Sequence, residues 1–364
     1  MDARYDDRDA SRTDVSPSRR RAQRYALARA MAQGQSFYCK ALAGESTYNI
    51  CINSDLTVSC NCQDFSGLGH IGDLRTQTLG EIMTGATARR FQDELAKRRF
   101  PTDVCAVCAE LTAVPARRLH AHPAPCAVPT RGIMVENTAL CNLRCHLCRR
   151  EELLATRTQH TMSTEDVELV AQVLREHRIR RVHFYSLGEP FIAKNVTEQV
   201  RALRAANPDI QIITSTNALL LDDEEKLQAA LEMDYVMVSL DGTDTEIVRM
   251  YQSGGDFDRA YGNMHRLVER RAQTDRSLEG SLLPVIEWKY LLFRWNDSAD
   301  QIAQAIELAE RSGVDLIGFY PGAASRKDRS RAHLTDRLLR QRGTREPTRT
   351  VVSLRAVPAK LWAP

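Results

Sequence analysis

Three cysteines within eight residues constrain this chain more than any other feature of its sequence. Residues 138–150 read TALCNLRCHLCRR, with three and then two residues between Cys141, Cys145 and Cys148. A short loop with this spacing can direct three thiolates at one metal centre. Every cysteine of the chain lies at or before Cys148, so no fourth cysteine follows the loop. A centre bound here is therefore expected to keep one coordination position open for chemistry.

This loop resembles the signature of the radical S-adenosylmethionine (SAM) enzymes, a Cys-x3-Cys-x2-Cys loop after the first strand of a barrel. The resemblance implies that Cys141, Cys145 and Cys148 hold a 4Fe–4S cluster whose free iron chelates the amino and carboxylate groups of SAM. The residue before the third cysteine, often aromatic in that family, is Leu147 here. The alternative is a zinc knuckle, although three cysteines without a fourth cysteine or paired histidines nearby make a poor closed tetrahedral site.

The composition excludes several classes of protein. A length of 364 residues suits one large or two ordinary domains, and a net charge of +3 gives no reason to expect a nucleic-acid partner. Ten cysteines without a signal-peptide pattern argue against a secreted disulfide scaffold. No run approaches the roughly 18 apolar residues that a membrane span needs. We therefore expect a cytoplasmic protein with no membrane contact.

A second group of cysteines precedes the loop, in residues 37–112. The segment YNICINSDLTVSCNC predicts a hairpin around residues 53–55, ATARRFQDELAKRR predicts a helix, and a Cys-x2-Cys pair follows. This order resembles the auxiliary iron–sulfur domain called SPASM, which in radical SAM enzymes usually follows the barrel. The resemblance implies one auxiliary 4Fe–4S cluster held by Cys39, Cys60, Cys105 and Cys108, with Cys62 as the alternative to Cys39. A structural zinc site is the alternative for the whole domain.

Strands and helices alternate from Gly132 onward, which predicts parallel strands with crossover helices. Six repeats are too few for an eight-stranded barrel, so the predicted fold class is α/β, a partial (β/α)6 barrel of TIM type preceded by the small cysteine-rich α+β domain. The predicted domains are a disordered or basic N-terminal arm (1–36), the auxiliary-cluster domain (37–112), a Pro/Ala-rich linker (113–130), the barrel (131–323) and an Arg-rich C-terminal tail, mobile or acting as a lid (324–364).

Ligands of such barrels bind at the carboxyl ends of the strands. The second strand ends in SLGEP, similar to the GGEP motif of the family, and the resemblance implies that Gly188 and Glu189 hold the amino group of SAM. Ser215 and Asn217 end the third strand and offer groups of the kind that bind the SAM ribose or carboxylate. Ser239 lies in an S-x-DG sequence like that of SPASM-type members and is also predicted to bind the cofactor.

Two acidic residues are predicted to be catalytic. Asp241 follows the fourth strand, where the alternative is that it caps the next helix. Glu287 shares one face of the fifth strand with Lys289, where a barrel strand is ordinarily apolar. Glu287 and Lys289 are expected to contact cofactor or substrate, and the alternative for them is a buried ion pair. Asn296 and Tyr320 are expected at the rim of the pocket.

The predicted function follows from the resemblance. A radical SAM enzyme cleaves SAM reductively to a 5′-deoxyadenosyl radical, which takes a hydrogen atom from its substrate. We expect a small polar substrate, such as a sugar or an aminocyclitol, oxidised or epimerised in a biosynthetic pathway. The implied partner is an electron donor such as flavodoxin or ferredoxin. The alternatives are maturation of a ribosomally made peptide, modification of a nucleic acid, and a non-enzymatic zinc protein.

Overall fold

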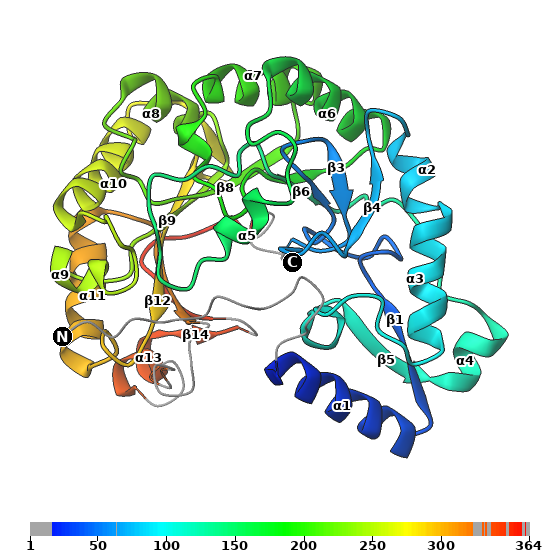
Figure 1. Cartoon of the computed structure of the whole chain (residues 1–364). Coiled ribbons are helices and arrows are strands. Elements are labelled where there is room, and N and C mark those ends of the chain that lie inside the picture. The colour runs from blue at the N-terminus through cyan, green and yellow to red at the C-terminus, as the bar shows by residue number, and fades with distance from the viewer. Residues whose placement is uncertain are drawn as a thin grey trace. The chain divides into compact units, whose positions relative to one another are not determined.

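The computed structural model divides the chain into two units, which are described separately (Figure 1). The cysteine-rich unit comprises Met1–Ile52 and Leu56–Arg131, and the barrel unit comprises Asn53–Asp55 and Gly132–Pro364. The structure describes residues 17–62, 64–322, 330, 332, 336–346, 349–358 and 361.

The barrel unit alternates strands and helices from its first strand onward. Its elements in chain order are β6 (Ile133–Val135), α5 (Arg150–Leu154), α6 (Thr164–Glu176), β7 (Arg181–His183), η2 (Pro190–Ile192), α7 (Val196–Ala206), β8 (Gln211–Thr216), α8 (Glu224–Leu231), β9 (Tyr235–Ser239), α9 (Thr245–Arg249), α10 (Phe257–Arg271), β10 (Ser277–Leu278), β11 (Ser281–Leu282), β12 (Val285–Leu292), α11 (Ala299–Ser312), β13 (Leu316–Pro321), α13 (Arg337–Arg342), β14 (Thr344–Arg345) and β15 (Thr350–Ser353).

Six of these strands lie side by side and run in the same direction. Their order is β6, β7, β8, β9, β12 and β13, with Ile133 opposite Val182 at one end and Glu287 opposite Leu316 at the other. Parallel neighbours need crossover connections, and the helices between the strands supply them. Figure 1 shows α7, α8, α10 and α11 outside the strands β8, β9 and β12. The predicted α/β fold with a parallel sheet is confirmed, and its form agrees with a partial barrel.

Polar caps determine where the crossover helices begin. Ser163 accepts a hydrogen bond from the backbone N–H of Asp166 at the start of α6, and the Asp166 side chain accepts one from the Ser163 N–H. Ser298 and Gln301 form the same reciprocal pair at the start of α11. These bonds satisfy backbone groups that a helix end leaves without partners. Both helices occupy the stretches in which the sequence pattern predicts them.

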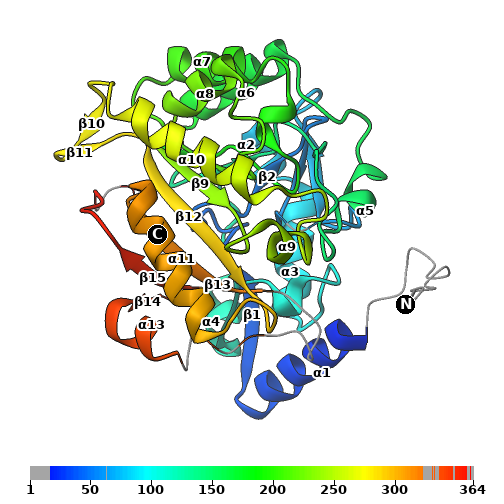
Figure 2. The same ribbon diagram turned by 90° about the vertical axis from the view of Figure 1, so that its left-hand side faces the viewer.

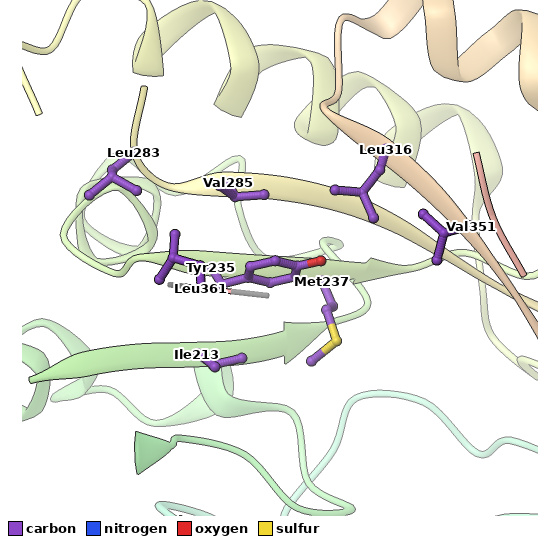
Figure 3. Close-up of a cluster of buried hydrophobic side chains, with 8 residues drawn as sticks. All are labelled: Ile213, Tyr235, Met237, Leu283, Val285, Leu316, Val351 and Leu361. Carbon is purple, nitrogen blue, oxygen red and sulfur yellow. The ribbon is translucent and has the colours of Figure 1, made fainter. Parts of the chain in front are cut away.

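An apolar cluster fills the amino-terminal part of the sheet face that forms the barrel interior (Figure 3). Its members are Ile213, Tyr235, Met237, Leu283, Val285, Leu316, Val351 and Leu361. Each of these residues is at most 9% exposed. Because side chains alternate along a strand, the residues two and four positions after Val285 face the same interior.

The C-terminal region adds two antiparallel strands to the barrel unit. β15 pairs with β13, and β14 pairs with β15. Val351 and Val352 are each only 1% exposed, so this short apolar run is part of the core. Figure 2 shows α13 beside α11. The prediction of a mobile tail is therefore corrected for α13, β14 and β15, and residues 323–329 lie outside the described part of the chain.

The described part of the cysteine-rich unit contains short strands, the two longer helices α1 and α3, and three short helical segments. Its elements are α1 (Pro17–Ala32), β1 (Gln35–Cys39), β2 (Cys51–Ile52), β3 (Thr57–Ser59), β4 (His70–Asp73), α2 (Leu79–Met83), α3 (Ala86–Ala96), η1 (Cys105–Val107), β5 (Leu111–Pro115) and α4 (Ala116–Ala121). β2, β3 and β4 form one antiparallel group, and β1 pairs with β5.

Local pattern explains most of this unit. β2 and β3 pair with Cys51 opposite Ser59, so the predicted hairpin is confirmed. Phe91 and Leu95 lie four residues apart on α3 and are both buried, as the helical pattern predicts. Leu95 packs with Phe37 of β1 in a small apolar cluster to which α1 also contributes. The helix therefore holds β1, and with it Cys39, against the rest of the unit.

Two predictions about the flanks of this unit need correction. The linker predicted over residues 113–130 begins with the end of β5 and with α4, because the run of alanine and arginine after Pro115 favours a helix. The predicted N-terminal arm contains α1, and residues 1–16 lie outside the described part. Neither α1 nor any other described helix is long and apolar enough to cross a membrane.

A buried ion pair lies on the interior face of the barrel unit, next to the apolar cluster. Both carboxylate oxygens of Glu287 are 2.6 Å from Nη1 of Arg349. The hydroxyls of Tyr235 and Tyr320 donate to the same carboxylate at 2.7 and 2.8 Å. A Cβ at Gly318 on β13 would overlap Glu287 Oε1, so glycine makes room for the pair. The pair therefore joins β9, β12, β13 and the C-terminal region.

We expect Arg349→Met to lower the free energy of unfolding by about 3–5 kcal/mol, because it leaves a buried carboxylate without its cation. The matched control is Arg342→Met, which breaks an exposed ion pair with Glu310 and should cost about 1 kcal/mol or less. Denaturant unfolding of both variants measures the difference. Equal effects of the two substitutions would show that the Glu287 pair does not hold the C-terminal region in place.

Candidate active site

The loop at residues 138–150, here called the cysteine loop, connects β6 to α5 at the carboxyl edge of the parallel sheet. Two of its backbone N–H groups donate to the segment after α9, from Arg144 to the carbonyl of Ser253 at 3.1 Å and from His146 to that of Tyr251 at 2.8 Å. Loops at this edge form the binding sites of parallel α/β folds. The first strand and the fourth crossover thus hold the loop in position.

The three thiols of the cysteine loop form an unusual donor set. Burial raises the pKa of Cys141 to about 11 and also raises the pKa values of Cys145 and Cys148, so the thiols stay protonated until a metal centre displaces their protons. Within the described residues, no three Cys, His, Asp or Glu side chains are grouped closely enough to hold one metal ion. Three thiolates on one short loop can hold a multi-iron cluster with one position left open, whereas a structural zinc site uses four ligands.

Gly188 brings the second strand's loop against the cysteine loop. A Cβ at this position would overlap the carbonyl oxygen of Thr138 and lie 2.9 Å from that of Leu140. The next residue, Glu189, donates its N–H to the same Leu140 carbonyl at 2.8 Å. Only glycine permits so close an approach of two backbones. The predicted cofactor-binding residue Gly188 therefore acts by allowing the two loops to meet.

Glu189 is 3% exposed and ties the ends of β7 and β8 together. Its carboxylate accepts hydrogen bonds from Thr216 Oγ1 at 2.7 Å, from the Asn217 N–H at 2.8 Å and from the Phe191 N–H at 3.3 Å. Burial raises the pKa of Glu189 to about 7. A carboxyl group poised near neutrality ionises when a cation, such as an ammonium group, is bound beside it.

Asn217 links the third strand to the cysteine loop. Its Nδ2 donates to Asn142 Oδ1 at 2.8 Å. The hydroxyls of Ser215 and Ser239 lie 3.1 Å apart on neighbouring strands. Asn217 and Ser239 also line a shallow pocket together with Leu143 of the loop. Predicted cofactor-binding residues from three different strands therefore lie along one edge beside the predicted cluster ligands.

Asp241 links the fourth and fifth strands. It is 1% exposed, and its Oδ1 accepts the Leu291 N–H at 2.7 Å. It does not cap the next helix, because Asp244 is the N-cap of α9. Gln252 supports the same turn by accepting the Asp241 N–H at 3.0 Å and donating to the Ser239 carbonyl at 2.9 Å. Burial raises the pKa of Asp241 to about 7. No motif in the sequence points to Gln252.

Glu287 has a structural role in the arrangement described above. Its partner is Arg349, from the region predicted to be a tail, and not Lys289 on its own strand. Because Arg349 and two tyrosines occupy its oxygens, the structure favours Asp241 over Glu287 as the catalytic candidate. Asn296 is fully buried and donates to the carbonyl of Asp241 at 2.9 Å, so it closes the turn instead of forming a pocket rim.

Four predicted ligands in the cysteine-rich unit line a single small cavity of about 20 Å³. They are Cys39, Cys60, Cys105 and Cys108. Asn61 donates to Cys108 Sγ at 2.9 Å, and Thr102 Oγ1 lies 3.1 Å from Cys105 Sγ. Hydrogen bonds to sulfur are a usual means of tuning iron–sulfur clusters.

Cys62 is oriented differently from these four residues. Its thiol lies 3.1 Å from Asn49 Oδ1, and it is not among the residues that line the cavity. A zinc ion holds sulfur atoms at about 2.3 Å, so its four thiolates lie roughly 4 Å from one another. The described residues contain no group of ligands drawn together in that way. Cys39, Cys60, Cys105 and Cys108 therefore face one cavity, and Cys62 does not.

Comparison with known proteins identifies the class of this site. The sequence model of the radical SAM superfamily matches residues 135–278. This span holds the three cysteines of the loop and the residues from Gly188 to Asp241 that surround it.

This part of the chain is therefore similar to the radical SAM enzymes.

Proteins of this superfamily use a 4Fe–4S cluster and SAM, which is the cofactor pair that the donor set predicts.

Two curated relatives are similar to part of this chain. A protein named probable GTP 3′,8-cyclase from Pyrococcus abyssi is 31% identical over 122 residues, which cover 34% of this chain and 38% of the relative. A GTP 3′,8-cyclase from Chlorobaculum tepidum is 32% identical over 136 residues, covering 37% and 40%. The chain thus spans about two fifths of the length of these curated relatives.

Among solved structures, the chain resembles Streptococcus suis SuiB bound to S-adenosylmethionine. The two are 14% identical with a TM-score of 0.39, and the match covers 50% of this chain and 37% of SuiB.

The pKa of Glu189 leads to a prediction about stability. Its ordinary value is 4.5 and burial raises it to about 7, so the folded chain binds this proton more tightly than the unfolded chain. The stability associated with the protonated carboxyl is present below about pH 4.5 and is lost as pH rises towards 7, by on the order of 3 kcal/mol. We expect Glu189→Gln to remove this slope from unfolding free energies measured across that range. Parallel curves for the two proteins would contradict the assignment.

Proposed function

We propose that this protein cleaves SAM reductively at the cysteine loop and takes a hydrogen atom from a small polar substrate. When bound, the cluster and SAM supply a 5′-deoxyadenosyl radical. The observation that carries the proposal is that the cysteine loop is bonded directly to the ends of the second and third strands, through Glu189 and Asn217. A SAM molecule on the loop would therefore meet these two residues.

The residues around the loop have distinct roles in this proposal. Cys141, Cys145 and Cys148 hold the cluster and leave one position open for the cofactor. Glu189 balances the ammonium group of SAM, and its poised carboxyl suits that task. Asn217, Ser215 and Ser239 provide hydrogen bonds to the cofactor's ribose or carboxylate. Asp241 contacts the substrate or the cofactor.

The cysteine-rich unit is proposed to determine the outcome of the reaction through a second cluster. We propose that Cys39, Cys60, Cys105 and Cys108 hold one auxiliary 4Fe–4S cluster, as in a SPASM domain. If this cluster accepts the electron left on the substrate radical, the net reaction is an oxidation. If a protein thiol returns a hydrogen atom, the reaction is an epimerisation. The external reductant is proposed to be a flavodoxin or a ferredoxin.

A sugar or aminocyclitol remains our proposed substrate class. It is supported by the hydroxyl and carboxyl groups of Ser215, Ser239 and Asp241, which match a ring with several polar substituents. The names of the curated relatives point to a guanine nucleotide, which also contains a hydroxylated sugar. Incubation with each class, followed by mass spectrometry of the products, distinguishes these substrates.

The second candidate function is the maturation of a ribosomally made peptide. SPASM-type radical SAM enzymes include such maturases, so the order of elements in residues 37–112 favours it. A pull-down with small peptides encoded beside the gene separates the two functions. Specific retention of one peptide would favour the maturase, and retention of none would favour the small substrate.

We expect Cys145→Ala to abolish formation of 5′-deoxyadenosine from SAM in reduced, anaerobically prepared protein, because the cluster loses one of its three ligands. Cys126→Ala is the matched control, since Cys126 belongs to neither predicted ligand set, and it should retain the activity. Chromatography of the nucleoside measures both. Activity in Cys145→Ala, or colourless wild-type protein without iron, would refute the proposed function.

Counting iron and sulfide tests the auxiliary cluster separately. The double variant Cys105→Ala/Cys108→Ala should lose about four irons per chain relative to the wild type. Cys39→Ala should lose a similar amount, whereas Cys62→Ala should keep the full count because its thiol faces Asn49. An unchanged count in Cys39→Ala together with a loss in Cys62→Ala would exchange the assignments of these two cysteines.

A further inference from the structure

The inward-facing side chains of the barrel unit change from buried and apolar to partly buried and mostly polar along the strands. Near the amino ends, the inward residues are the buried members of the apolar cluster in Figure 3. Towards the carboxyl ends, the inward residues on successive strands are only partly buried, and they are Tyr185, Ser215, Ser239, Lys289 and Tyr320. The carboxyl-terminal part of the interior face is therefore partly accessible to solvent. A substrate that enters by this route meets these side chains.

Lys289 is the cation among these side chains, and it has no counterion in the described part of the chain. None of the ion pairs or hydrogen bonds found there involves its ammonium group, so every described carboxylate oxygen is more than 4.0 Å away. Its one close aromatic neighbour is Tyr320, whose ring centre lies 5.7 Å from Nζ. A cation held in a site of limited hydration is costly unless an anion or several acceptors compensate it.

The two carboxylates nearest to Lys289 are engaged elsewhere. Glu287 is compensated by Arg349 and by the hydroxyls of Tyr235 and Tyr320. Asp241 accepts the backbone N–H of Leu291 and makes no ion pair among the described residues. Both carboxylates favour the charged form of Lys289 from a distance, but neither contacts its ammonium group among the described residues.

Two serine hydroxyl groups lie next to the ammonium group of Lys289. Lys289 is directly opposite Ser239 in the pairing of β12 with β9. The Ser239 hydroxyl is 3.1 Å from that of Ser215 on the next strand. An ammonium group flanked by hydroxyl donors is a suitable environment for a carboxylate or a phosphate.

We propose that Lys289 binds an anionic group of the substrate, a carboxylate or a phosphate, at the open end of the barrel interior. This inference rests on the proposed function and narrows it, because a neutral polyol or an amine would leave the lysine uncompensated. SAM also carries a carboxylate, and one of its proposed contacts, Ser239 on β9, is directly opposite Lys289. The binding of SAM and of other anions is therefore measured separately in the test.

The test uses anaerobically prepared full-length protein in three forms. They are the wild type, Lys289→Met and the control Lys194→Met, which changes an exposed lysine after η2 at the same edge of the sheet. Calorimetry measures binding of inorganic phosphate, pyrophosphate and citrate, and separately of SAM. We expect the affinity for the best-bound anion to fall roughly tenfold or more in Lys289→Met and to be unchanged in the control.

Several outcomes would overturn the proposal. Equal anion binding by the wild type and Lys289→Met would show that Lys289 does not bind the anion. No anion binding by the wild type would show that the proposed anion site does not exist. Weaker SAM binding in Lys289→Met, with anion binding unchanged, would assign the lysine to the SAM carboxylate. Failure of the wild type to form 5′-deoxyadenosine would refute the proposed function alone, because anion binding is measured independently of it.

Stability provides a second readout. Since Lys289 has no partner within the described chain, Lys289→Met should leave the thermal midpoint unchanged or raise it, and Lys289→Arg should keep the anion affinity. A fall in the midpoint as large as that of Arg349→Met would show an internal partner for Lys289 and overturn the proposal.

Discussion

The parallel hydrogen bonding of six strands is the constraint on which the candidate active site depends. It places the carboxyl ends of β6, β7, β8, β9 and β12 on one edge, so that residues as far apart in the chain as Arg144 and Ser253 become neighbours. Two backbone contacts then refine the arrangement. Gly188 lets the second loop touch the cysteine loop, and the Glu189 N–H fixes it there. The proposed cluster ligands and the residues proposed to face SAM are consequently held by backbone geometry as well as by side-chain contacts.

Charge is distributed unevenly over the barrel interior. Glu287 and Arg349 neutralise each other inside a shell of tyrosine hydroxyls and connect the C-terminal strands to the sheet. Lys289, two residues further along β12, has no such partner among the described residues. One charged pair thus stabilises the fold, and one single charge is available for a ligand. This division is the physical basis for expecting an anionic substrate.

The sequence predicts the parts of this structure that depend on local pattern. Strand–helix alternation predicts the parallel sheet, and the spacing of Cys141, Cys145 and Cys148 predicts the loop. Contacts between distant segments have no local signature. Arg349 lies in an Arg-rich stretch where nothing distinguishes the one arginine that pairs with Glu287, and Gln252 is an ordinary amide in a loop. The choice between Cys39 and Cys62 depends on side-chain direction, which spacing along the chain does not determine.

The most direct test of the central claim, that SAM docks on a cluster held by the cysteine loop, is electron paramagnetic resonance of the reduced protein. The triple variant Cys39→Ala/Cys105→Ala/Cys108→Ala removes the proposed auxiliary cluster and leaves the loop intact. We predict an iron–sulfur signal in this variant whose g values shift when SAM is added, because SAM binds the open iron. A signal that SAM leaves unchanged, or no signal from an iron-free protein, would contradict the claim.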